Sequence, residues 1–271
     1  MHPKIIQKLN EIEAHEQVRI LHAVESGSRA WGFASPDSDY DVRFIYVRDP
    51  GFYLKLEKTR DIIEWQLDET LDINGWDLQK TLRLLRKSNP TLFEWASSPI
   101  IYKTTPEWQT VSACFPDYFL TKPGLYHYLS MAEGNYRDYL KQDIVRIKKY
   151  LYVLRPIFAC KWILERRTPP PMLFSELIAA TADPALVPEI EHLLEIKAQT
   201  PEAGKMPRID TLNFYIEETL PVLKAQADAL PRTATKSYDA LNRLFQNVLM
   251  RGPKRETREI PNIILCPFAL P

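Results

Sequence analysis

The spacing of apolar residues divides the chain into a first part with strand-like runs and a longer helical part. Apolar positions 5, 6, 9 and 12 recur at intervals typical of a helix over residues 3–15. Runs rich in β-branched or aromatic residues, bounded by turn residues, predict strands at 18–24, 40–47, 60–67 and 69–76. Strands that follow one another closely, with helices on either side, are typical of a small flanked sheet.

From residue 77 onward the apolar spacing is mainly helical. Asp77 suits the N-cap of a first helix, and Asn89-Pro90 ends that helix and begins another. Residues 123–166 predict two long helices or one broken helix, with Pro156 as the kink or break. Further amphipathic helices are predicted at 173–198, 209–228 and 236–250.

These elements together predict an α+β fold of two parts. We expect residues 1–110 to form a domain built on a small mixed β-sheet. Residues 111–252 are expected to form a mainly helical domain that closes one side of a cleft. Residues 253–271 lack periodicity and predict an extended C-terminal tail.

Composition narrows the class of protein. Apolar residues make up 45% and charged residues 26% of the sequence, both ordinary for a globular protein. The formal net charge is +0, so a nucleic-acid surface would require local segregation of charge. The cysteines at 114, 160 and 266 are far apart, which argues against a disulfide framework. No apolar run approaches the ~18 residues of a membrane span, so we expect a cytoplasmic protein without a membrane partner.

The chemistry is concentrated in the segment 26–45. Gly27 and Ser28 stand where a predicted strand ends and a short helix begins. A helix N-terminus presents unpaired amides that bind phosphate, glycine permits close backbone approach, and a serine hydroxyl can donate to the same oxygens. We therefore expect Gly27 and Ser28 to hold phosphate.

Two aspartates follow at the start of the next predicted strand. Alternation places the side chains of Asp39 and Asp41 on one face of that strand. Like charges so close need a counter-ion, and Mg²⁺ uses one or two carboxylates together with phosphate oxygens. Arg43 continues the same face, where we expect an ion pair or a substrate contact. The segment thus predicts a phosphate cradle opposite a paired-carboxylate metal site, as phosphoryl transfer requires.

The segment resembles the signature of the DNA polymerase β superfamily of nucleotidyltransferases. In that signature Gly-Ser is followed by Asp-x-Asp, here Gly27-Ser28 and Asp39-Tyr40-Asp41, with Arg29, Ala30, Gly32 and Ser38 as the pattern prefers. Residues 26–47, 72–85 and 87–102 are similar to bacterial and phage nucleotidyltransferases linked to RNA repair. The shared features are Asp72, Trp76-Asp77-Leu78-Gln79-Lys80 and Asn89-Pro90 followed by Glu94-Trp95.

The resemblance implies that residues 1–110 form a nucleotidyltransferase domain that binds an NTP such as ATP and two Mg²⁺ ions, or Mn²⁺ in their place. It also implies a third carboxylate on a neighbouring strand, which shares a metal with Asp39 and Asp41. Asp72 is the first choice, because it lies in a strand-like segment. Asp77, which could instead be a helix cap, Glu64 and Asp68 remain as alternatives.

The resemblance also suggests nucleotide-binding residues. Ser38 belongs to the pattern, and Arg29 has two interpretations, a phosphate contact or a solvent-facing helix residue. Residues 141–167 contain eight Lys or Arg against two acidic residues, which a solvated helix face would explain. Alternatively, Lys148, Lys149 and Arg155 face the cleft and bind triphosphate or a nucleic-acid backbone. The helical domain of similar enzymes supplies such a lysine, so Lys148 or Lys149 is expected to do so here.

These expectations combine into one reaction, the transfer of a nucleoside monophosphate from an NTP to an acceptor hydroxyl with release of pyrophosphate. The resemblance points to an RNA end as the acceptor. Two alternatives remain open. One is transfer of AMP or another nucleoside monophosphate to a protein or small molecule. The other is a catalytically silent nucleotide-binding regulatory module.

Overall fold

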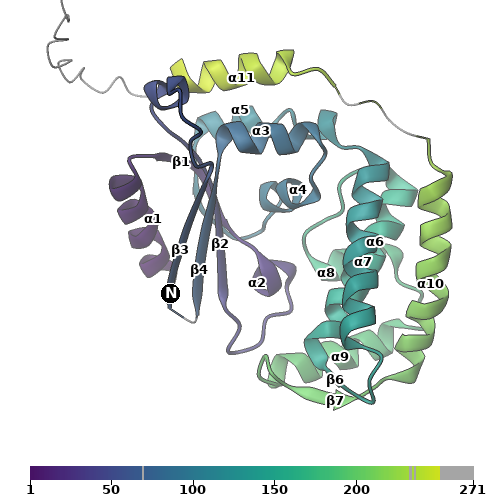
Figure 1. Ribbon diagram of the computed structural model, residues 1–271. Helices are drawn as coiled ribbons and strands as arrows, with labels where there is room; N and C mark the ends of the chain where they lie inside the picture. Colours follow the sequence, from purple (N-terminus) through teal and green to yellow (C-terminus); the bar gives the residue numbers. More distant parts are fainter. Residues whose placement is uncertain (69, 232–233, 235, 251–271) are drawn as a thin grey trace, which may run out of the picture.

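The computed structural model describes residues 1–68, 70–231, 234 and 236–250 (Figure 1). The tail expected at 253–271, together with Cys266, lies outside the described residues. The architecture is α+β, with a mixed sheet in the N-terminal part and helices after it, as the sequence predicts. Of the helices in the described part of the chain, none is long and apolar enough to cross a membrane.

The sheet has the strand order β3-β4-β2-β1-β5. Its strands are β1 (Arg19–Glu25), β2 (Tyr40–Val47), β3 (Ile62–Asp68), β4 (Leu71–Asp77) and β5 (Ile101–Thr104). The central strands β2 and β4 run parallel, whereas the other neighbours are antiparallel. Since parallel strands begin at the same edge of a sheet, the first residues of β2 and β4 lie side by side.

Helices lie around this sheet and form most of the remaining described chain. Those of the first part are α1 (His2–Glu16), α2 (Gly27–Trp31), η1 (Pro50–Leu54), α3 (Leu78–Arg86), α4 (Pro90–Ala96), α5 (Pro106–Ser112) and η2 (Phe115–Tyr118). The later elements are α6 (Thr121–Tyr139), β6 (Ile144–Arg146), α7 (Ile147–Arg166), α8 (Phe174–Thr181), α9 (Val187–Gln199), β7 (Lys205–Pro207), α10 (Asp210–Ala229) and α11 (Asp239–Met250). Strands β6 and β7 pair with each other in a separate two-stranded sheet.

Different helices cover the two faces of the main sheet (Figure 1). The apolar stripe of α1 packs on one face, against a cluster that includes Val42 and Ile73. Helices α3, α4 and α5 pack on the other face. Because alternate residues of a strand point to opposite faces, Asp41 and Asp72 lie on the face away from α1.

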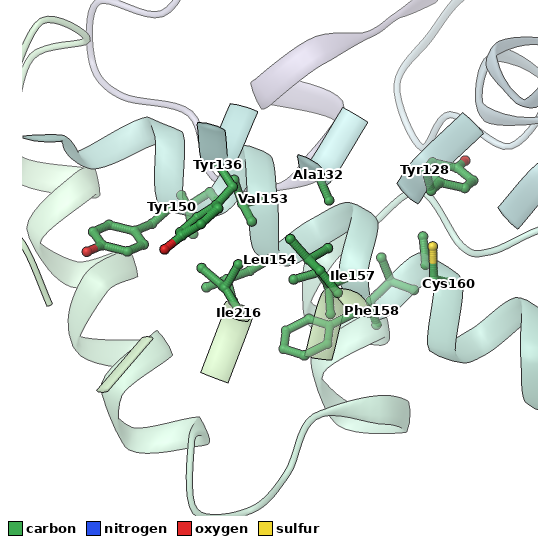
Figure 2. Packing of buried hydrophobic residues seen from close by; sticks show 14 of the residues in the cluster. Tyr128, Ala132, Tyr136, Tyr150, Val153, Leu154, Ile157, Phe158, Cys160 and Ile216 are labelled. Atoms are coloured by element: carbon green, nitrogen blue, oxygen red, sulfur yellow. The ribbon is translucent and has the colours of Figure 1, made fainter. Parts of the chain in front are cut away.

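The helical part has a hydrophobic core of its own (Figure 2). Helices α6 and α7 lie against each other, and Ala132, Leu154 and Phe158 are fully buried there together with Ile216 of α10. Phe33, in the loop that follows α2, is buried in the same cluster. This contact anchors the loop between α2 and β2 in the helical core.

Helix α11 returns to the N-terminal part of the molecule, above α3 and α5 (Figure 1). Its residues Leu241 and Val248 are buried in the cluster that covers the sheet face opposite α1. The ring of Phe245 packs edge-on against Tyr53 at 5.0 Å between centroids. The last described helix therefore completes the core around the sheet.

Two long helices, α6 and α7, form over most of residues 123–166, as one of the two alternatives predicts. Pro156 lies inside α7 and does not break it, so the alternative of a helix broken at Pro156 is wrong. The two long helices are instead separated by residues 140–146, which include β6. A proline inside a helix removes one backbone hydrogen bond and costs about 3 kcal/mol. Complete burial of Leu154, Ile157 and Phe158 on either side of Pro156 offsets that cost.

The single helix predicted over 173–198 is also wrong, because this segment forms α8 and α9. The Asp183-Pro184 turn separates them: the Asp183 carboxylate accepts from the amide of Ala185 at 2.9 Å. An Asp side chain that bonds backbone two residues ahead competes with helix formation. Strand β5 and helix α5 were not predicted at all.

A buried ion pair joins α4 to the helical part. Arg155 and Glu94 are only 1% and 8% exposed, and the guanidinium donates to the Glu94 carboxylate at 2.9 Å. The Tyr128 hydroxyl donates to the same oxygen at 2.8 Å, and the Arg155 guanidinium lies 4.5 Å from the Trp31 ring centroid. The prediction that Arg155 faces the cleft is therefore wrong.

We predict that breaking this ion pair destabilises the whole chain. Glu94→Gln leaves the charge of Arg155 buried without its partner, and such a change costs about 3–5 kcal/mol. The free energy of unfolding in urea measures it. Asp138→Asn, which removes an exposed ion pair with Arg137, is the matched control and should leave the midpoint unchanged. A cost below about 1 kcal/mol for Glu94→Gln would contradict the role of the pair.

Candidate active site

Asp41 and Asp72 are neighbours across the parallel strand pair. In the register of β2 and β4, Asp41 is paired with Asp72 and Val42 with Ile73. The two carboxylate side chains are 33% and 50% exposed, respectively. The structure thus brings together two of the predicted site residues at one accessible position.

Asp39 lies immediately before β2 and is exposed. Burial, and then the negative charges of Glu202, Asp41 and Asp39, raise the pKa of Tyr152 in α7 to about 12. Asp39 and Asp41 therefore both act electrostatically on a side chain of the helical part. Asp41 lies on the sheet face away from α1.

Gly27 lies directly against the Asp41 carboxylate. Its φ of 61° is in the left-handed region, and a Cβ at this position would overlap Asp41 Oδ2. The amide of Ser26 donates to the Asp41 backbone oxygen at 2.8 Å, which fixes the approach of the two segments. Ser28 is 6% exposed in the first turn of α2. The glycine-serine turn and Asp41 thus form a single packed unit.

A buried glutamate that the sequence analysis did not select supports this unit. Glu25 is the last residue of β1 and is 0% exposed. Its carboxylate accepts from the amide of Asp41 at 2.7 Å and from the hydroxyl of Tyr102. Burial raises the pKa of Glu25, while these two hydrogen bonds oppose the rise. Its place at the end of an apolar run, just before Gly27, was the only signal in the sequence.

Arg43 bridges the two neighbouring aspartates. Its Nη2 donates to Asp41 Oδ1 at 2.8 Å and to Asp72 Oδ2 at 2.7 Å, so the expected ion pair is confirmed. Burial raises the pKa of Asp41, the charge of Arg43 opposes that effect, and the charges of Asp72 and Asp39 add to it. The carboxylates of Asp39, Asp41 and Asp72 thus repel one another, and the positive charge of Arg43 reduces this repulsion.

The donor atoms of the site are of the type that magnesium prefers. Carboxylate oxygens of Asp39, Asp41 and Asp72 are hard ligands, and the missing side chain of Gly27 lets the Asp41 carboxylate lie against the backbone of the glycine-serine turn. In the described part of the chain, no three His, Cys, Asp or Glu side chains are arranged around one point as metal ligands. Arg43 takes the position between Asp41 and Asp72. The side chains are therefore of the chemical type that binds Mg²⁺, but a Mg²⁺ ion shared by Asp41 and Asp72 requires Arg43 to leave its place between them.

Arg29 and Ser38 have structural partners in the loop before β2. The Arg29 guanidinium donates to the backbone oxygens of Ser38 and Asp39 and lies 3.8 Å from the centroid of the Tyr40 ring. The Ser38 hydroxyl accepts from the amide of Ser35 at 2.8 Å and is 3% exposed. Both residues therefore hold the loop that carries Asp39.

Glu202, between α9 and β7, fastens this loop to the helical part. Its carboxylate accepts from the Ser38 hydroxyl and from Lys197 at 2.9 Å, and it forms an ion pair with Lys148 at 2.8 Å. The Glu202 amide donates to the Asp37 carboxylate at 3.0 Å. Burial opposes ionisation, but the hydrogen bonds from Glu202's three partners outweigh it and lower its pKa to about 2. No local pattern in the sequence could have identified Glu202.

The two candidate lysines of α7 point to different surroundings. Lys148 reaches Glu202, which also binds the loop before Asp39. Lys149 donates to Asn135 Oδ1 at 3.2 Å, and its ammonium lies 3.6 Å from the centroid of the Tyr139 ring. Burial and the charge of Lys148 lower the pKa of Lys149. Of the two lysines, only Lys148 is therefore connected, through Glu202, to the loop that carries Asp39.

The alternatives for the third carboxylate lie elsewhere. Asp77 is at the other end of β4 from Asp72, 2% exposed, and caps α3 by accepting from the amide of Gln79 at 2.7 Å. Burial raises the pKa of Asp77 to about 6. Glu64 is exposed on β3 and pairs with Arg60 at 2.9 Å. The side chain of Asp68 lies outside the described part of the structure.

Comparison with known proteins identifies relatives along most of the chain. Residues 1–247 match the model of the RNA repair pathway DNA polymerase beta family, RlaP. The chain is 46% identical over 253 residues to the uncharacterized protein YcgL of Bacillus subtilis (strain 168), covering 92% of this chain and 96% of that protein.

Among solved structures, the chain is similar to a nucleotidyltransferase-like protein from Exiguobacterium sibiricum 255-15. The sequence identity is 14% and the TM-score 0.30, over 83% of this chain and 75% of that chain. A likeness this distant carries no argument about function.

We predict that Gly27→Ala displaces the Asp41 carboxylate and destabilises the chain by about 1–3 kcal/mol, because alanine strains a positive φ and its Cβ overlaps Oδ2. Urea unfolding measures the stability. The matched control is Gly134→Ala in α6, where a Cβ would meet nothing within 4 Å. That change should be neutral or stabilise by up to about 1 kcal/mol. Equal stability of the two variants would show that the contact with Asp41 is unimportant.

Proposed function

The chain belongs to the RNA repair pathway DNA polymerase beta family, and we propose that it transfers a nucleoside monophosphate from an NTP to an RNA end. The observation that supports this most directly is the pairing of Asp41 with Asp72 across parallel strands, next to a glycine-serine turn. Two carboxylates and a close backbone approach meet there at one accessible position, and Lys148 of α7 is connected through Glu202 to the loop that precedes it. That combination is what a triphosphate with its cations requires.

Asp39, Asp41 and Asp72 are the residues that would hold two Mg²⁺ ions, with Mn²⁺ as a substitute. Such ions, when bound, neutralise charge on the triphosphate and acidify the attacking hydroxyl. Glu25 would keep Asp41 in place through its backbone amide, at 2.7 Å. Gly27 would keep the glycine-serine turn in direct contact with Asp41, because any side chain there would overlap the carboxylate.

The remaining residues would position the triphosphate. We assign the β- and γ-phosphates to the turn of Gly27 and Ser28, and a phosphate oxygen to the ammonium of Lys148. Arg29, Ser38 and Glu202 would act indirectly, by holding the loop that carries Asp39. Positioning of this kind supplies much of the rate acceleration in phosphoryl transfer.

In the proposed reaction the acceptor oxygen forms a bond to the α-phosphorus, and the bond from that phosphorus to the oxygen bridging the β-phosphate breaks. Pyrophosphate takes the electron pair of the broken bond. Asp72, which is 50% exposed, would accept the proton of the acceptor hydroxyl. The products are the acceptor extended by one nucleoside monophosphate, pyrophosphate and one proton.

The acceptor is assigned from the family, whose description links it to RNA repair. Three exposed basic residues near the two-stranded sheet offer local positive charge: Lys141 before β6, Arg146 in β6 and Lys205 in β7. A neutral chain can bind RNA where such charge is concentrated. Transfer to a protein or small molecule, and nucleotide binding without transfer, are outcomes that the next experiment distinguishes.

We predict that the purified protein transfers label from an α-³²P-labelled NTP to RNA in the presence of Mg²⁺. The panel contains all four NTPs and, as acceptors, RNA oligonucleotides with different ends, polypeptides and small molecules. Asp41→Asn should reduce the rate by at least about a hundredfold, because a metal ligand contributes several kcal/mol to the transition state. The double variant Asp39→Ala, Asp41→Ala is the blank.

If the label appears on a polypeptide or on a small molecule, nucleotidyl transfer is supported, but the acceptor is that molecule and not RNA. If wild type and blank behaved alike with every acceptor, while both bound nucleotide, the protein would be a binding module and the proposed reaction would be wrong.

We predict that Lys148→Met raises the KM for the NTP by about 10- to 100-fold with a smaller effect on kcat, since a charge-assisted hydrogen bond to phosphate is worth about 1.5–3 kcal/mol. Lys149→Met is the matched control on the neighbouring residue and should change KM by less than about threefold. Steady-state kinetics with varied NTP measures both. A larger effect of Lys149→Met would assign the phosphate contact to the other lysine.

A further inference from the structure

The guanidinium of Arg43 occupies the position that a cation shared by Asp41 and Asp72 would occupy. Besides its contacts to the two carboxylates at 2.8 and 2.7 Å, it donates through Nη1 to the backbone oxygens of Val42 at 3.1 Å and Asp72 at 3.2 Å. The Arg43 side chain is 18% exposed. Several acceptors and partial burial therefore fix the guanidinium in place.

The other basic side chains of the site are directed elsewhere. Arg29 donates to backbone oxygens of the loop before β2, and Lys148 pairs with Glu202. The repulsion between Asp41 and Asp72 is therefore relieved chiefly by Arg43. A divalent cation that binds both carboxylates has to displace Nη2, because the two cations compete for the same oxygens.

We propose that Arg43 is a built-in counter-ion, which neutralises Asp41 and Asp72 while nucleotide is absent and yields to metal when a triphosphate binds. The inference rests on the proposed function, since it assumes that these aspartates hold metal. A triphosphate offers Arg43 new partners, because a guanidinium binds phosphate oxygens in a bidentate manner. Metal and nucleotide then bind with positive coupling.

The coupling has a direct consequence for the free protein. Bare divalent cations compete with Arg43 and bind weakly, whereas the same cations bind strongly when the triphosphate accompanies them. Thermodynamic linkage requires the reverse effect as well, so that metal strengthens nucleotide binding by the same factor. A merely structural arginine would lower stability when removed, but it would not strengthen metal binding.

The test measures Mn²⁺ binding by electron paramagnetic resonance, with and without α,β-methylene ATP, a triphosphate that cannot be cleaved at the α-phosphate. In Arg43→Gln without nucleotide, we expect Mn²⁺ to bind at least about tenfold more tightly than in wild type, because a competing charge is gone. The gain in Mn²⁺ affinity on adding the analogue should shrink by a similar factor.

Arg48→Gln is the matched control. Arg48 follows β2 directly and donates to the backbone oxygen of Glu16 at 2.6 Å, away from the aspartates, so its Mn²⁺ binding should equal that of wild type. Thermal unfolding establishes that each variant is folded. If Arg43→Gln does not fold, Arg43→Lys replaces it, and a smaller gain in the same direction is expected.

Unchanged or weaker Mn²⁺ binding in a folded, nucleotide-free Arg43 variant would overturn the inference. The inference would also be overturned if α,β-methylene ATP increased the Mn²⁺ affinity of Arg43→Gln as much as that of wild type. The Mn²⁺ measurement and the labelling experiment test different proposals. If label is transferred but Arg43→Gln does not change Mn²⁺ binding, the proposed reaction stands and the proposed role of Arg43 is wrong. The Mn²⁺ effect without transfer would retain Arg43 as counter-ion and refute the reaction.

Discussion

Negative charge on neighbouring parallel strands is the constraint around which this molecule is built. Asp41 and Asp72 are register partners, and the charge of Asp39 adds to the repulsion at Asp41. Such a group is unfavourable unless positive charge is close, and Arg43 supplies it in the free protein. Stabilising the fold alone would be simpler with apolar side chains at these positions. The needs of the fold alone therefore do not explain these carboxylates.

Polar contacts connect the helical part to the elements that carry the candidate site. Glu202 binds Lys148, Lys197 and Ser38 and so joins the loop before Asp39 to α7 and α9. Arg155 of α7 and Glu94 of α4 form a buried ion pair. Removing either partner of a buried ion pair is strongly destabilising, so this contact favours the observed arrangement of α4 and α7.

The fold class and the centre of the site could be predicted from the sequence, because their signals are local. Gly27 and Asp41 are close in the chain, and alternation and turn chemistry dictate how they meet. Asp72 required a strand prediction together with the family resemblance. Glu202 could not be predicted, because only the packing of distant helices brings it to the loop. Pro156 misled the prediction, since burial of the surrounding helix outweighs its local preference.

The position of α11 has a consequence for how the protein is made. Leu241 and Val248 are buried in a cluster that also contains Leu21 and Val24 of β1. During synthesis on the ribosome, the sheet and the helices α3 to α5 emerge long before α11. Until α11 arrives, the part of this cluster that Leu241 and Val248 cover is exposed to water and to other nascent chains. We therefore expect the first part of the chain to complete its packing only after the helical part has been synthesised.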